Sequence, residues 1–256
     1  MVNVMRSLVI AGAVVALGSA FAAPANATLM IAADVNGSVF TCADNQAGCD
    51  QNAAPGVLTL GPTVIGGVLF EGSSQFQVVG PPTNALLTNS VQITNNSGNL
   101  ATIQFAVGGT SFASPTATFS AAGSGTWLNA EGSTIELQWY GDTGNDQGAE
   151  SVTDLPGVLL TTGGPFVAGA GASAFSTGTL TGPWVTSDPF SWTMFAEGDL
   201  VSGATATLAG RSQDITSDVV VPEPASLAIL GAGLLGFGVF SWFRRRKDDG
   251  GNFASA

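Results

Sequence analysis

The chain of 256 residues contains 18 acidic residues, six basic residues and no histidine, and its formal net charge is −12. Fifteen of the acidic residues but only one basic residue, Arg211, lie between residues 28 and 221, and this negative field excludes nucleic-acid binding because it repels phosphates. Ser-His-Asp and Cys-His mechanisms are excluded too, since the chain has no histidine and its one lysine lies at position 247.

Residues 1–27 have the three parts of a secretory signal peptide: a positive start at Arg6, an apolar run over 8–17 and small residues at 25–27. We expect signal peptidase to cut before Thr28. A retained anchor is the alternative, although the apolar run is too short to span a bilayer. The chain after residue 27 is therefore expected to be exported.

Cys42 and Cys49 are the only cysteines, with six residues between them. Because an exported protein meets oxidising conditions, we expect a disulfide that closes a small loop. A shared metal ion is the alternative, but a chain without histidine cannot complete a usual zinc site.

Residues 28–211 are predicted to form an all-β ectodomain. Apolar side chains occupy every second position over 90–94, 102–107 and 134–139, as in strands with one buried and one wet face. Gly-, Asn- and Ser-rich turns separate such runs, and crossover helices of a parallel sheet are missing from the pattern. We expect an antiparallel β-sandwich. The aromatic residues expected in its core are Phe105, Trp139, Phe190, Trp192 and Phe195.

Glu131 and Glu136, near Trp139 and Tyr140, are the best pair of carboxylates for a glycosidase-like reaction. Glu136, however, falls on the polar face of its predicted strand, where a solvated side chain is the ordinary interpretation. We expect no catalytic residue and no enzyme activity.

The loop 142–150 gathers oxygen ligands of the kind that Ca²⁺ prefers. Its spacing departs from an EF-hand, because Gln147 stands where glycine is required and Thr153 where a bidentate glutamate is required. An ordinary polar loop is the preferred interpretation, and we expect no metal and no cofactor. The weak calcium candidates are Asp142, Asp146 and Glu150.

Four tryptophans, at positions 127, 139, 184 and 192, have flat faces on which pyranose rings can stack. Most of them are expected in the core. Trp184 stands between Pro183 and Val185 in a predicted loop, and an exposed position is the open alternative for it.

Residues 212–221 lose the alternation and are predicted to form a linker to the motif Pro222-Glu223-Pro224, whose prolines favour extended backbone. The 19 residues 225–243 carry no charge and make a helix just long enough to span a bilayer. A basic cluster follows, which stays on the cytoplasmic side because crossing the bilayer is costly. It consists of Arg244, Arg245, Arg246 and Lys247, and we expect 248–256 to be a cytoplasmic tail.

Together these parts, over 222–247, resemble the PEP-CTERM sorting signal. The resemblance implies recognition by an exosortase, a membrane-embedded cysteine transpeptidase-like enzyme that cuts near the motif and releases or relocates the ectodomain. Pro222, Glu223 and Pro224 would be its recognition element, and a proline stalk above an ordinary anchor is the alternative. One face of the helix would pack against another membrane helix, although small residues are common in membrane spans. That face holds Ala228, Ala232 and Gly236.

The ectodomain is more loosely similar to one found on such proteins, in which a short-spaced cysteine pair precedes stretches like 119–127. This similarity implies a surface or matrix protein of exopolysaccharide-producing Gram-negative bacteria. We expect a non-catalytic structural or adhesive protein of the cell surface or biofilm matrix, with exopolysaccharide as a partner. A carbohydrate-binding module and, less favoured, a polysaccharide-active enzyme on the same tail are the alternatives.

Overall fold

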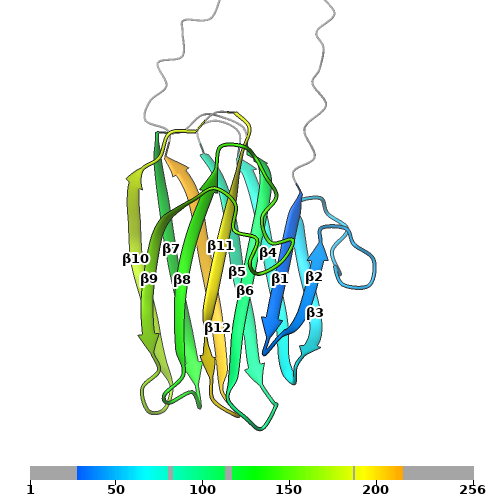
Figure 1. The fold of residues 1–256 in the computed structure, drawn as a ribbon, viewed down its shortest axis with the longest axis vertical. Coiled ribbons are helices and arrows are strands. Elements are labelled where there is room, and N and C mark those ends of the chain that lie inside the picture. The colour runs from blue at the N-terminus through cyan, green and yellow to red at the C-terminus, as the bar shows by residue number, and fades with distance from the viewer. Residues whose placement is uncertain (1–27, 80–82, 113–116, 187, 216–256) are drawn as a thin grey trace, which may run out of the picture. The chain divides into compact units, whose positions relative to one another are not determined.

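The computed structural model describes residues 28–79, 83–112, 117–186 and 188–215, which form β-strands and their connections (Figure 1). None of these residues forms a helix that could cross a membrane. The predicted signal peptide, the membrane helix and the basic cluster lie outside the described residues. The strands are β1 (Leu29–Val35), β2 (Ser38–Ala43), β3 (Val57–Ile65), β4 (Val68–Val79), β5 (Thr83–Asn95), β6 (Ala101–Phe112), β7 (Thr118–Leu128), β8 (Thr134–Asp142), β9 (Val158–Val167), β10 (Ser173–Pro183), β11 (Phe190–Leu200) and β12 (Thr205–Ile215).

The strands form two antiparallel sheets of six strands each. Sheet A has the order β2-β1-β6-β11-β8-β9, and sheet B has the order β10-β7-β12-β5-β4-β3. Strands β9 and β10 lie at one edge of the sandwich and β2 and β3 at the other (Figure 1). The expected all-β antiparallel sandwich is therefore confirmed.

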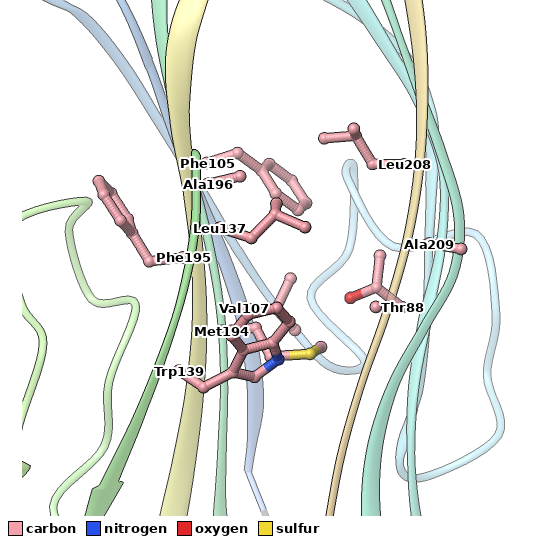
Figure 2. A pocket seen from close by; sticks show the side chains of 11 residues that line it. Thr88, Phe105, Val107, Leu137, Trp139, Met194, Phe195, Ala196, Leu208 and Ala209 are labelled. Atoms are coloured by element: carbon pink, nitrogen blue, oxygen red, sulfur yellow. The ribbon is translucent and has the colours of Figure 1, made fainter. Parts of the chain in front are cut away.

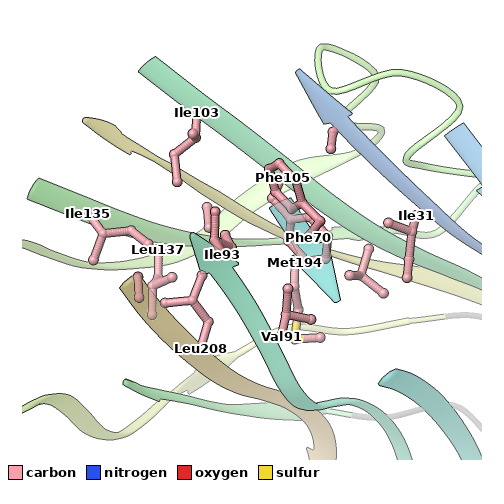
Figure 3. Packing of buried hydrophobic residues seen from close by; sticks show 14 of the residues in the cluster. Ile31, Phe70, Val91, Ile93, Ile103, Phe105, Ile135, Leu137, Met194 and Leu208 are labelled. Carbon is pink, nitrogen blue, oxygen red and sulfur yellow. The ribbon is translucent and has the colours of Figure 1, made fainter. Parts of the chain in front are cut away.

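The core between the sheets follows from the alternation of the strands. In β8 the side chains of Ile135, Leu137 and Trp139 are buried, and the side chains between them are half-buried on the outer face. Facing residues of the two sheets pack in the same way, as the rings of Phe70 and Phe105 do with centroids 6.3 Å apart (Figure 3). A cavity of about 30 Å³ remains beside Trp139, which is far below the roughly 300 Å³ of a small ligand site (Figure 2).

A second, smaller cluster covers the outer face of sheet A. It arises because the connection 143–157 folds back over the strands, so that Ala149 and Val152 bury Ala106 and Phe195. Phe195 is buried as expected, but it points away from the space between the sheets (Figure 2). The register explains this: Met194 pairs with Trp139 of β8, so the next residue faces the opposite way.

Candidate functional site

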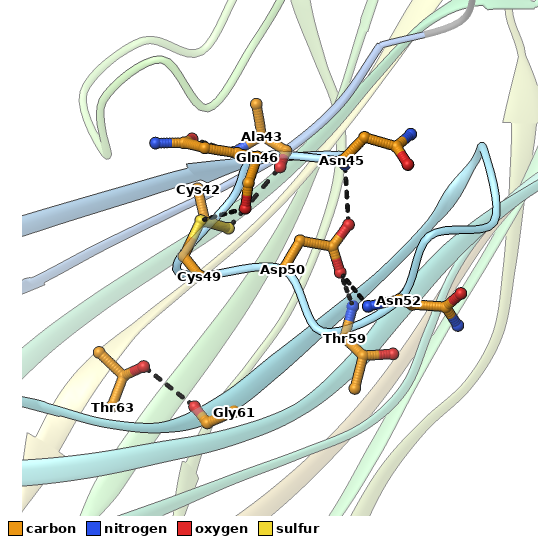
Figure 4. The surroundings of a disulfide bond; sticks show 10 residues. All are labelled: Cys42, Ala43, Asn45, Gln46, Cys49, Asp50, Asn52, Thr59, Gly61 and Thr63. Carbon is orange, nitrogen blue, oxygen red and sulfur yellow. Dashed lines mark hydrogen bonds between the residues drawn. A yellow bond between two sulfur atoms is a disulfide. The ribbon is translucent and has the colours of Figure 1, made fainter.

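The predicted disulfide between Cys42 and Cys49 is confirmed, with an S–S distance of 2.05 Å (Figure 4). It closes the turn after β2 at the sheet edge, and the alternative of a metal held by these two cysteines is thereby wrong. The Asp50 carboxylate fixes the same segment, since Oδ2 accepts a hydrogen bond from the amide of Asn45 at 2.8 Å and Oδ1 accepts one from that of Thr59 at 2.9 Å. The polar groups of this loop therefore act on its own backbone.

A polar row lies along β8 on the outer face of sheet A. The Tyr140 hydroxyl donates a hydrogen bond to Oε1 of Gln138 at 2.6 Å, and the Gln138 amide donates one to Oε1 of Glu136 at 3.2 Å. Glu197 of β11 stands directly opposite Glu136 in the strand register. Burial of the phenol, and then the charges of Glu197 and Glu136, raise the pKa of Tyr140.

The structure does not bring the predicted carboxylate pair together. Glu131 is exposed in the turn between β7 and β8, whereas Glu136 is half-buried on its strand. The partner that the fold gives to Glu136 is Glu197, which sequence reasoning missed because only the pairing of β8 with β11 brings it there. Neither Glu136 nor Glu197 lines the cavity beside Trp139.

In the loop with the calcium candidates, the side chains of Asp142 and Asn145 form hydrogen bonds with backbone amides. Asp142 Oδ2 accepts a hydrogen bond from the amide of Asp146 at 2.8 Å, and Asn145 Oδ1 accepts one from the amide of Ser111 at 2.6 Å. Glu150 is exposed. Across the described residues, no three acidic or cysteine side chains come together as metal ligands. The loop is thus fastened to the end of β6 as the cover of the outer face.

The four tryptophans considered for sugar stacking, at positions 127, 139, 184 and 192, are all buried, so they form no sugar-stacking platform. Trp184, for which the sequence leaves an exposed position as an alternative, has an exposed fraction of only 8%. Its ring packs edge-on against Phe190, with centroids 5.5 Å apart, and against Trp192 at 4.6 Å. Among the side chains that the structure describes, no aromatic is exposed.

The comparisons with solved structures give only distant likenesses. A carbohydrate-binding module of the β-sandwich superfamily is 14% identical, with 72% of this chain and 70% of that chain covered and a TM-score of 0.25. A module that recognises mannan is 13% identical, with 63% and 90% covered and a TM-score of 0.25. The enzymatically active domain of tailspike protein 4 of bacteriophage CBA120 is 9% identical, with 56% of this chain covered and a TM-score of 0.25, and this chain spans 19% of that one. Likenesses at this TM-score transfer no ligand or activity.

The sorting motif itself lies outside the described residues, as do Ala228, Ala232 and Gly236 of the expected packing face. No curated protein matches the chain. Residues 220–247, however, match the family described as the PEP-CTERM protein-sorting motif. This segment contains the Pro-Glu-Pro element at 222–224 and the four basic residues at 244–247. The chain is therefore a protein that carries a PEP-CTERM sorting motif, which implies export and targeting to an exosortase.

Proposed function

We propose that the chain is a structural or adhesive protein of the cell surface or extracellular matrix, delivered there by exosortase processing, and that its β-sandwich is not catalytic. The match of residues 220–247 to the sorting motif carries this proposal. The disulfide supports it, because a bridge of this kind persists in an oxidising compartment outside the cytoplasm.

The site chemistry favours a non-catalytic role. The Asp50 carboxylate is committed to backbone amides, and the Glu136 carboxylate belongs to the hydrogen-bonded row that ends at Tyr140. A glycosidase instead needs two carboxylates that flank a substrate cleft. An adhesive protein needs only a stable fold and an exposed face that can bind a ligand.

The mass of the protein recovered from its host tests this proposal. We expect a chain that begins at Thr28, contains the disulfide and ends near residues 222–224, together with any glycan that has been added. The same protein from a host without exosortase is the control, and it should keep residues 225–256. A surface protein that retains this segment in the normal host would contradict exosortase processing.

A further inference from the structure

A groove runs over the outer face of sheet B, the face turned away from the core. It consists of two adjoining hollows of about 400 and 340 Å³, and both are lined by Ser124 of β7 and Ala209 of β12. The first extends to Ser176 and Thr179 of β10, and the second extends to Ser90 of β5. We call this surface the sheet B groove.

A row of β-bulges shapes this groove. The register shifts between Ser176 and Thr179 in β10 and between Leu208 and Gly210 in β12, and both shifts fall beside Ser124 of the strand between them. A bulge bends its strand and re-aims the neighbouring side chains, and bulges are common next to binding sites. One irregularity lies where β10 pairs with β7 and the other where β12 pairs with β5, so the sheet is hollowed on both sides of Ser124 where a flat face would otherwise stand.

The lining of the groove consists of small and hydroxyl-bearing side chains. Ser124, Ser176 and Thr179 are exposed, and a hydroxyl both donates and accepts hydrogen bonds. Phe175 and Leu208 also line the second hollow, but their side chains are buried in the core between the sheets. A ligand that fits must therefore be rich in hydroxyl groups. Over β7, β12 and β5 it must lie on side chains, because each of these strands is already paired on both sides.

Arg211 gives the groove its charge. It lines the first hollow, is exposed, and is the only basic residue in the part of the chain that the structure describes. No ion pair or hydrogen bond holds its guanidinium to any described residue. Glu71, on the same face, instead accepts a hydrogen bond from the Gln92 amide at 3.0 Å. An unpaired guanidinium among hydroxyls is a fork of donors suited to a carboxylate.

We infer that the sheet B groove binds a glycan segment that carries a carboxylate, namely a uronate-bearing oligosaccharide. The uronate carboxylate pairs with Arg211, and the ring hydroxyls exchange hydrogen bonds with Ser124, Ser176 and Thr179. The inference deepens the proposed function and rests on it, since an adhesive matrix protein requires a ligand. A short segment is sufficient, because at physiological salt the remaining acidic charges are screened beyond about 8 Å.

Isothermal titration calorimetry tests this with the exported protein purified from its host. The probes are a hexamer of galacturonic acid, neutral maltohexaose and a hexaglutamate peptide. We expect the galacturonate hexamer to bind more tightly than the other two. Arg211→Gln should weaken its binding by at least about tenfold, because a charged hydrogen-bonding partner is lost. Ser124→Tyr should weaken it as well by filling the groove.

The matched control is Ser38→Tyr, which adds the same ring at an exposed serine of β2 in sheet A and should leave binding unchanged. Thermal unfolding of each variant establishes that it is folded. The inference is overturned if the wild type does not bind the galacturonate hexamer, or if Arg211→Gln binds it equally well. Equal binding of maltohexaose would remove the role of the carboxylate, and equal binding of hexaglutamate would assign the groove to acidic peptides. The mass measurement tests export and processing separately, so the two failures are distinguishable.

Discussion

At the scale of single residues, Tyr140 reports on the polar face of sheet A, because it is the only tyrosine of the chain. Its absorbance titration therefore follows one group. Burial and then the charges of Glu197 and Glu136 raise its pKa above the ordinary value of 10.0. We expect Glu197→Gln to lower the titration midpoint, and Glu71→Gln, on sheet B, to leave it unchanged. Equal midpoints for wild type and Glu197→Gln would contradict this account of the Tyr140 environment.

The same shift gives a pH dependence of stability. The fold favours the neutral phenol, so the contribution of Tyr140 is fully present below its unfolded pKa and is lost as the pH rises through its folded pKa. We expect the free energy of unfolding of wild type to fall above about pH 10, and that of Tyr140→Phe to fall less, as measured by urea titration at successive pH values. An identical decline in both proteins would show that other groups cause it.

The disulfide between Cys42 and Cys49 is a second feature at this scale that affects the stability of the fold. It should stabilise the fold by roughly 2 kcal/mol, because it restricts the unfolded chain. We expect a reductant to lower the urea midpoint of wild type towards that of the double variant Cys42→Ala/Cys49→Ala. The double variant itself, having no bridge, should not respond to the reductant. If reduction left the wild-type midpoint in place, the bridge would have no measurable effect on stability.

At the scale of the strands, the close packing of β7 depends on glycine. A Cβ added at Gly125 would lie 2.5 Å from the Phe175 ring and 2.6 Å from the carbonyl oxygen of Thr207. Because one neighbour is backbone, the strands would have to move apart. We expect Gly125→Ala to destabilise the protein by about 1–3 kcal/mol. The control is Gly169→Ala, where a Cβ would meet nothing within 4 Å, and chemical denaturation should separate the two variants.

The strands themselves were predictable, but their partners were not. The alternating runs at 90–94, 102–107 and 134–139 lie within β5, β6 and β8, because a half-buried strand shows itself in local sequence. Which strands become neighbours depends on contacts between distant segments. The pairing of β11 with β8 places Glu197 opposite Glu136, and no local sequence pattern predicts this pairing.

The groove escaped prediction for the same reason. Its serines and threonines appear in the sequence as ordinary polar-face residues, and Arg211 appears only as an isolated charge. Bulges become visible only once the registers of β10, β7, β12 and β5 are known. Trp184 is the opposite case, in which the sequence leaves an exposed position open but the side chain is buried. Its position beside Pro183 indicates a loop, yet its ring packs against Phe190 and Trp192.

At the scale of the whole molecule, the residues that form the β-sandwich and the residues of the sorting motif lie in different segments of the chain. The contacts that hold the two sheets together lie within residues 28–215, whereas the sorting motif lies at 220–247. The basic charge is divided likewise, with one arginine in the described residues and four basic residues at 244–247. A change in the motif should therefore alter processing without altering the fold of the sandwich.

Replacing Glu223 by alanine tests this separation. We expect export to depend on the predicted signal peptide, residues 1–27, and membrane retention on the predicted span 225–243 with its basic flank, and the substitution changes neither. We expect the lost carboxylate to affect only recognition by the exosortase. We expect export to continue and processing to stop, so that the protein accumulates in the inner membrane with residues 244–247 attached, as fractionation and mass measurement would show.

The matched control is Asp218→Ala, which removes a carboxylate from the predicted linker and should be processed normally. Replacing Arg244, Arg245 and Arg246 together should act differently, because without the positive stop the apolar run can slip outward before an enzyme engages it. Release of the Glu223→Ala protein as efficient as that of wild type would deny the carboxylate a recognition role. It would favour the alternative in which the prolines form a stalk above an ordinary membrane anchor.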